Sequence, residues 1–427
     1  MTPLFRNARY VAWLVSDTSR GLAEALFAFA VPLIALVVTD DPAQAGVIAA
    51  TGAAVRLVLT LAGGVLADRR PRVPLMIAGA VIGCALAGAF TLLATADALT
   101  FAVLLAIDAL LAARTGLFDV AGESALKQVV APEAMGRAQA ANQARDAALQ
   151  LAGGPLGGLL LAAGAGAVGA AMAACHAIAG ASAWAISRLR PAAGAPGAAP
   201  RPRAASGAGP RSAGREVVEG LAWIWARPDL RGVVVVTTIV NLGISAAVTT
   251  AIYALQQAGH SPAAIGWVGA GVGAAMLVGA LGAGPVVHRL PTGLVAIAGL
   301  AALACGAAGV ALVTTPWAVT AVLAAPALLL PAVNAGLSGY FVVATPDRLL
   351  GRANAAAQVF SRGAMPLAPL VAGLGLAWAG RGPTILVCAG ICALAAALAV
   401  GTRALRILPA EPAWAEHARR ADPVPAA

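Results

Sequence analysis

The sequence carries little charge. Only 11% of its 427 residues are charged, whereas a soluble protein of this length would carry about a quarter. Hydrophobic residues make up 60% of the chain. A single soluble core could not bury that much apolar surface, so we expect the lipid bilayer to cover the remainder.

Lysine is almost absent, since Lys127 is the only lysine among 28 basic residues. The formal net charge is nevertheless +10. The basic residues are spread over the short gaps between apolar runs instead of forming a patch, which argues against nucleic acid as a partner.

Motifs of nucleotide, metal and disulfide chemistry are also missing. No Gly-x-x-x-x-Gly-Lys-Ser/Thr loop occurs, so ATP does not drive the protein through its own chain. The five cysteines lie within apolar runs without metal-ligand or disulfide spacing, and the four histidines are scattered. We therefore expect a non-enzyme with no catalytic residue, no metal and no cofactor.

Long apolar runs dominate the sequence. A spanning helix needs roughly 20 apolar residues, and twelve runs meet this length. The first run is longer than the core of a typical cleavable signal peptide, so we expect the N-terminus to be kept. The predicted spans are 10–38, 44–66, 74–94, 99–118, 137–163, 166–187, 231–254, 264–287, 293–313, 317–341, 353–379 and 384–405.

Arginine placement predicts the topology. With the N-terminus in the cytoplasm, 22 basic residues fall on the inner side, one (Arg381) on the outer side and five within spans. This asymmetry follows the positive-inside rule, and an odd number of spans would destroy it. We expect both termini in the cytoplasm. The arginines within spans are candidates for charge pairs: Arg20, Arg56, Arg114, Arg145 and Arg362.

Two internal sequence repeats indicate that the chain arose by duplication. The charged segment 64–72 lies between apolar runs and recurs in altered form at 284–291, and the segment 132–143 matches 346–358 at nearly the same offset. Both pairs occupy equivalent places in the two halves, which supports two six-helix repeats.

Composition divides the chain further. The stretch 190–215 is rich in Pro, Ala, Gly and Arg, which predicts a flexible cytoplasmic linker. The predicted domains are an N-terminal six-helix half (1–189), the linker (190–215), an amphipathic surface helix (216–229), a C-terminal six-helix half (230–406) and a cytoplasmic tail (407–427).

The hinge Gly64-x-x-x-Asp68-Arg69-x-Pro71-Arg72 resembles the signature of the major facilitator superfamily, Gly-x-x-x-Asp-Arg-x-Gly-Arg-Arg, with Pro71 in place of the second glycine. The resemblance implies an all-α membrane protein of twelve transmembrane helices in two pseudo-symmetric six-helix halves. It also implies a latch that holds one face closed, in which Gly64 lets two helices approach closely. A simple cluster of charges that fixes topology is the alternative.

Other segments resemble exporters of that superfamily. Residues 118–138 and 215–221 are similar to the bacterial transmembrane secretion effectors and enterobactin exporters. In the fifth span Gly154, Pro155 and Gly158 resemble the antiporter motif Gly-Pro-x-x-Gly-Gly, although its final glycine is missing. The resemblance implies export, and ordinary glycine packing is the alternative.

The first span holds Asp17, Arg20 and Glu24, three and four residues apart on one helix face. Charged residues are costly inside a membrane and usually pair or function there. Because Arg20 can neutralise only one of the two acids well, the other is left to exchange protons. Glu24 is the first candidate for proton coupling, followed by Asp17, Asp146 and Asp108. A structural triad that fixes helix packing is the alternative.

Further polar side chains recur at helical spacing. Arg145 is expected to point away from its neighbour Asp146. In the superfamily, helices one, four, seven and ten line the central path, so the resemblance implies residues that line it here. Hydrogen bonding between helices is the alternative. The substrate-path candidates are Asn241, Ser245, Thr249, Tyr253, Asn334, Ser338, Gln143 and Gln358.

The resemblance leads us to expect a secondary active transporter. It would be a proton-coupled exporter of a small amphipathic organic molecule, such as a drug, siderophore or secondary metabolite, working by alternating access. Its partners would be that substrate, protons and the lipid bilayer, and it would act as a monomer in the bacterial inner membrane. An uptake symporter or facilitator, and a non-transporting membrane receptor or scaffold, stay open as alternatives.

Overall fold

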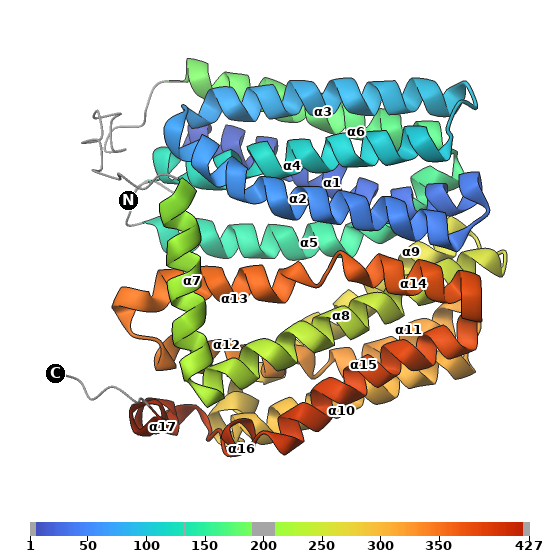
Figure 1. Cartoon of the computed structure of the whole chain (residues 1–427). Coiled ribbons are helices and arrows are strands. Elements are labelled where there is room, and N and C mark those ends of the chain that lie inside the picture. Colours follow the sequence, from blue (N-terminus) through green and yellow to red (C-terminus); the bar gives the residue numbers. More distant parts are fainter. Residues whose placement is uncertain (1–5, 131–133, 190–209, 422–427) are drawn as a thin grey trace. The chain divides into compact units, whose positions relative to one another are not determined.

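The computed structural model describes residues 6–130, 134–189 and 210–421, and every regular element among them is helical (Figure 1). Residues 190–209 of the predicted linker lie outside the described residues. The described chain therefore agrees with the all-helical prediction drawn from its long apolar runs.

Helices match all twelve predicted spans. Eleven of these segments are long and apolar enough to cross a membrane, and the remaining one, α5, is long enough but carries a polar stripe. The segments are α1 (Ala8–Thr39), α2 (Pro42–Arg69), α3 (Arg72–Thr95), α4 (Phe101–Val129), α5 (Met135–Ala162), α6 (Ala165–Arg188), α8 (Pro228–Gln257), α9 (Pro262–Arg289), α10 (Thr292–Gly309), α11 with α12 (Pro316–Ala327 and Leu330–Ala344), α13 with α14 (Asp347–Gly363 and Leu367–Ala379) and α15 (Arg381–Gly401).

The chain divides into two compact units. The first unit holds α1–α6 and the first turns of α9, and the second holds α7, α8, the rest of α9 and the helices that follow. Within the first unit α2 packs on α4 and α3 packs on α6, and within the second α15 packs on α8 and α10.

Two predicted spans are each broken into two helices. One break separates α11 from α12 at Leu328 and Leu329, and the other separates α13 from α14 at residues 364–366. Pro331 lies in the first turn of α12, and Pro366 directly precedes α14. Proline lacks the backbone N–H that would continue the preceding helix, which explains why each helix ends there.

The hinge after α2 is anchored by an arginine. α2 ends at Arg69 and α3 begins at Arg72, whose side chain is buried and donates from Nη1 to the carbonyl oxygen of Ser124 at 2.6 Å. This bond ties the start of α3 to α4. The side chain of Asp68 lies outside the described residues.

The role predicted for Gly64 is wrong, because a Cβ at this position would meet no atom within 4 Å. The close approach occurs one residue earlier. A Cβ on Gly63 would collide with the backbone carbonyl oxygen of Gly116 in α4. The tight crossing of α2 and α4 therefore depends on Gly63 and Gly116.

Residues 407–421 of the predicted tail are folded onto the second unit, and we call them the C-terminal strap. They include a short 3-10 turn (Glu411–Ala413) and α17 (Trp414–Ala421), and they follow the single turn of α16 (Arg403–Arg406). The carbonyl oxygens of Leu408 and Pro409 accept hydrogen bonds of 3.2 Å from the first two amides of α10. The strap thus satisfies donors that have no partner within their own helix.

Side chains of the C-terminal strap also contact the second unit. Trp414 is buried, and its Nε1 donates to Thr292 Oγ1 at 3.0 Å. His288, which replaces the acid in the second copy of the hinge, has its Nδ1 3.4 Å from Glu411 Oε2. The strap therefore covers the turn between α9 and α10.

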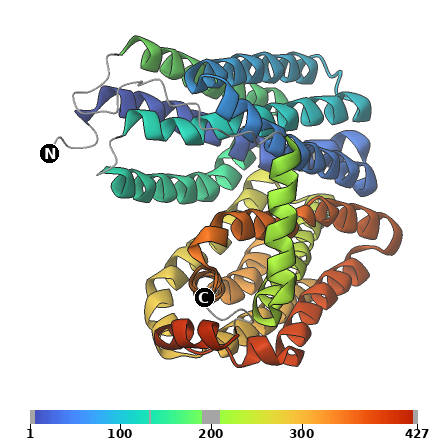
Figure 2. The ribbon, with the colours of Figure 1, turned by 60° about the vertical axis from the view of Figure 1, so that its left-hand side comes forward.

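A buried ion pair lies at the start of α8. The preceding helix, α7 (Pro210–Ala226), begins within the predicted linker and lies against α13 (Figure 2). Arg227 follows it, is only 1% exposed, and has Nη2 2.8 Å from Asp229 Oδ2. Tyr340 of α12 donates its hydroxyl to the same oxygen at 2.6 Å, and Arg227 Nη1 donates to the carbonyl oxygen of Ala344 at 3.0 Å. These bonds join α7, α8 and α12.

The glycine contact between α2 and α4 gives a matched test. Gly63→Ala places a methyl group against backbone that cannot move without separating the helices, so we expect it to lose about 1–3 kcal/mol of stability. Gly64→Ala adds the same methyl group to open space and should unfold like the wild type. Thermal unfolding in detergent micelles measures both, and equal stabilities of the two variants would contradict the described crossing.

Candidate functional site

Seven charged side chains from three helices of the first unit form one network, the charge cluster. Most of the network lies inside the helical bundle, where each charge needs a partner because little water is present to stabilise it, and one member, Asp146, is 54% exposed. Its members are Asp17, Arg20 and Glu24 of α1, Arg114 and Asp119 of α4, and Arg145 and Asp146 of α5.

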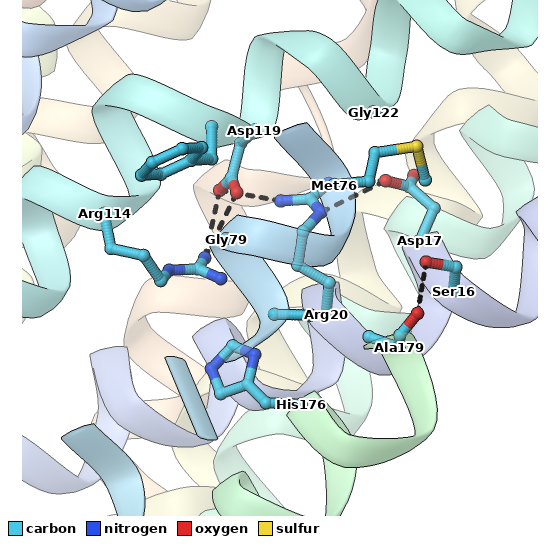
Figure 3. Close-up of a pocket in the computed structure, with 12 residues that line it drawn as sticks. Ser16, Asp17, Arg20, Met76, Gly79, Arg114, Asp119, Gly122, His176 and Ala179 are labelled. Carbon is cyan, nitrogen blue, oxygen red and sulfur yellow. Dashed lines mark hydrogen bonds and ion pairs between the residues drawn. The ribbon is translucent and has the colours of Figure 1, made fainter. Parts of the chain in front are cut away.

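Arg20 lies at the centre of the charge cluster. The spacing of three and four residues places Asp17 and Glu24 beside it on α1, with ion-pair distances of 2.8 and 2.9 Å. The same guanidinium is 2.8 Å from Asp119 of α4 (Figure 3). Arg20 therefore contacts three carboxylates at once, one more than the two that its helix spacing suggested, and its single positive charge is shared among them.

Arg114 makes the second link between α1 and α4. Its side chain is 2% exposed, and its Nη2 lies 3.0 Å from Glu24 and 3.1 Å from Asp119. Glu24 and Asp119 therefore each contact both Arg20 and Arg114. This alternation of charges fixes the relative position of the two helices.

Arg145 brings α5 into the charge cluster. It lies 2.7 Å from Asp17 and also 2.7 Å from Asp146, so the prediction that it points away from its neighbour is wrong. Its guanidinium lies over the ring of Trp13, 5.6 Å from the centroid, and Trp13 Nε1 donates to the carbonyl oxygen of Gly122 at 2.8 Å. A cation over an indole face is attracted to it, which holds Arg145 in place.

The charge cluster does not balance. Its three arginines face four carboxylates, so it holds one acid more than it has bases. The carboxylates also differ in their access to water, because Asp146 is 54% exposed, Glu24 32%, Asp119 12% and Asp17 2%. An excess acid with access to water can take up and release a proton.

A small cavity adjoins the charge cluster between α1, α3, α4 and α6 (Figure 3). Arg20, Arg114 and Asp119 form its polar wall, and Met76 and Phe118 contribute apolar surface. The cavity wall therefore combines charged groups with apolar side chains.

His176 of α6 lines the same cavity. Its ring packs on α3 at Gly83, where a Cβ would lie 2.8 Å from Nδ1. The residue is 2% exposed, and Nδ1 has no hydrogen-bond partner among the described residues.

Two members of this site were not among the sequence candidates. Asp119 lies one residue beyond the predicted span 99–118, whereas α4 continues to Val129. The missed signal was helical spacing, since Asp119 is four residues after Thr115 on the same face. His176 gave no signal beyond a lone polar residue in an apolar run.

Asp108 lies apart from the charge cluster. It is buried against Gly52 of α2, where a Cβ would collide with its carboxylate, and its Oδ2 has no hydrogen-bond partner among the described residues. Arg56 and Arg362 are exposed and make no ion pair within the part of the chain that the structure describes. Three of the five arginines predicted to pair therefore do so.

The substrate-path candidates differ in exposure. Gln143, Asn334, Ser338 and Gln358 are exposed, and Tyr253 is fully buried. The other candidates on α8 precede Tyr253 at four-residue spacing and are half-buried. Among them, Thr249 Oγ1 donates to the backbone carbonyl oxygen of Ser245 at 2.8 Å. The half-buried residues are Asn241, Ser245 and Thr249.

The glycines of the fifth span make close contacts. A Cβ on Gly154 or Gly158 would collide with backbone in the first turns of α9, which belong to the same unit. Pro155 is buried inside α5 between these two contacts. The residues of the exporter-like motif therefore act in packing.

The chain matches neither a protein-family model nor a curated protein sequence. Solved structures do match. A bacterial homologue of the human lysosomal transporter Spinster gives a TM-score of 0.68 at 13% identity, over 100% of both chains. A bacterial homologue of the iron transporter ferroportin gives 0.67 at 14% identity, over 94% of this chain and 99% of that one. A variant of the nucleoside transporter NupG gives 0.65 at 12% identity, over 92% of this chain and 100% of that one.

The chain has the major facilitator fold. Identities this low establish the fold alone, and they confirm the prediction of an all-α membrane protein of this architecture. In this major facilitator fold the charge cluster joins the first, fourth and fifth spanning helices.

Removing the central arginine tests the charge cluster. Arg20→Gln leaves three carboxylates with fewer partners, and breaking a buried ion pair costs about 3–5 kcal/mol. Because Arg20 is 19% exposed, we expect a loss near the lower end of that range. Arg56→Gln removes an exposed arginine without an ion pair and should be neutral. Unfolding in mixed micelles followed by circular dichroism compares the two variants, and equal stabilities would contradict the described network.

Proposed function

We propose that the protein is a secondary active transporter that exchanges protons for a small amphipathic organic molecule. It would lie in a bacterial inner membrane with both termini in the cytoplasm. The observation that carries the proposal is the excess acid of the charge cluster. A purely structural network inside a membrane would be expected to balance its charges, whereas an excess carboxyl can bind a proton from one side and release it to the other.

Glu24 is the best candidate for the proton carrier. It contacts Arg20 on its own helix and Arg114 on α4, so its neutralisation would loosen a link between two helices. It is also far more exposed than Asp17, which gives it access to water. Among the described residues Asp146 pairs with its own neighbour Arg145 alone, so its neutralisation would change no ion pair between described helices. Proton binding can shift a conformational equilibrium only where it alters such contacts.

The wall of the small cavity combines charged and apolar groups, as the path of an amphipathic molecule would. Arg20, Arg114 and Asp119 line it together with Met76 and Phe118. Membrane transporters among the structural neighbours support transport rather than catalysis. The resemblance of segment 118–138 to exporters favours export over uptake. A membrane receptor that does not transport is disfavoured, because its function would not require an excess acid in the bundle.

Glu24→Gln tests the coupling. In proteoliposomes with an imposed pH gradient, we expect this variant to accumulate a transported amphipathic dye no better than protein-free liposomes. It should still exchange external dye for internal dye without a gradient, because the substrate path is unchanged. Asp146→Asn is the control and should retain accumulation.

Unchanged gradient-driven accumulation by Glu24→Gln would show that another group carries the proton. The direction is tested in intact cells, where expression of an exporter lowers the dye content. A higher dye content on expression would reject export in favour of uptake.

A further inference from the structure

The second unit contains one charge deep within its spans. Arg362 lies in the span Leu349–Ala379 and follows its first residue by 13 positions, about 20 Å along a helix. All other charged side chains in the described spans of this unit lie within four residues of a span end. Arg362 therefore lies several helical turns from either end of its span.

Arg362 is exposed and makes no ion pair among the described residues. An unpaired arginine in contact with lipid at this depth is strongly disfavoured, so the side chain must face a water-accessible space within the bundle. In contrast, each arginine of the charge cluster already holds at least two carboxylates. Within the described spans of the second unit, Arg362 is the arginine far from a span end, and its guanidinium has no carboxylate partner among the described residues.

The neighbouring side chains fit a polar path. Asn354, Gln358 and Arg362 are spaced four residues apart on α13, and all three are exposed, so they form one polar stripe. The helix breaks directly after this stripe, since α13 ends at Gly363 and α14 begins at Leu367. The positive end of the α14 dipole adds to the positive charge of Arg362.

A second polar stripe lies at the same depth. Both α13 and α14 pack against α8, which carries Asn241, Ser245 and Thr249. The two spans run in the same direction because three spans separate them. Asn241 follows Pro228, the first residue of its span, by 13 positions, as Arg362 follows Leu349. The polar side chains of α8 and the charge of α13 thus reach equal depth.

We propose that Arg362 binds the anionic group of the transported molecule, so that the substrate class is amphipathic organic anions bearing a carboxylate, sulfonate or phosphate. This inference rests on the proposed transport function and narrows it. A guanidinium pairs with such groups through two parallel hydrogen bonds, and the amides of Asn241 and Gln358 are available to orient the remainder of a polar head.

The test uses three probes that share a naphthalene ring: naphthalene-2-sulfonate, the uncharged naphthalene-2-sulfonamide and trimethyl(2-naphthyl)ammonium. Binding to the full-length protein in phosphatidylcholine nanodiscs is measured by thermal shift, and exchange is measured in proteoliposomes. We expect the sulfonate to stabilise the wild type most. Its affinity should fall at least about tenfold in Arg362→Gln, as loss of a charge-assisted contact implies, and less in Arg362→Lys. Arg352→Gln removes an arginine from the start of the same helix and should bind like the wild type.

Three results would overturn the inference. One is sulfonate binding by Arg362→Gln at wild-type affinity, and another is equal binding of all three probes. The third is an effect of Arg362→Gln that arises only when phosphatidylglycerol is added, which would assign the arginine to a lipid headgroup. Failure of the transport proposal is separate. Sulfonate binding that depends on Arg362 but occurs without exchange would contradict the transport proposal and support the anion site. Exchange of all three probes by Arg362→Gln would support transport and contradict the anion site.

Discussion

The need to pair charges inside a membrane governs the first unit. One guanidinium, Arg20, contacts three carboxylates, and Arg114 and Arg145 extend the network to α4 and α5. Because little water is available to solvate an unpaired charge there, the helices must keep the positions that hold these contacts. The network therefore fixes the bundle, and its excess acid provides the chemistry of proton exchange.

Glycine packing sets the distances between helices in the first unit. The crossing of Gly63 and Gly116 sets the distance between α2 and α4, and Gly122 leaves room for Asp17, whose Oδ1 would lie 3.2 Å from a Cβ there. In the second unit the buried ion pair of Arg227 and Asp229 and the C-terminal strap hold the helices in position. The two halves thus share a fold but differ in what stabilises them. In the described spans the first half holds many charges, and the second holds Arg362 alone far from a span end.

Apolar runs predicted every spanning helix, because lipid imposes a minimum length that a sequence displays directly. Contacts were harder to predict. The span of α4 was ended too early because an apolar criterion stops at Asp119, whereas the helix continues once Arg20 neutralises that acid. The motif led us to predict that Gly64 makes the close helix contact. Only the geometry of the crossing shows that Gly63 makes it instead. The C-terminal strap was missed because its large buried apolar residues, Leu408 and Trp414, are too few to give a periodic signal.

The central claim is that an acid of the charge cluster exchanges protons. Infrared difference spectroscopy of the protein in nanodiscs, titrated with acid and base, observes the C=O stretch of a protonated carboxyl directly. The account predicts a band that appears reversibly in the wild type, persists in Asp146→Asn and disappears in Glu24→Gln. A band that persists unchanged in Glu24→Gln, or the absence of any titrating band in the wild type, would contradict it.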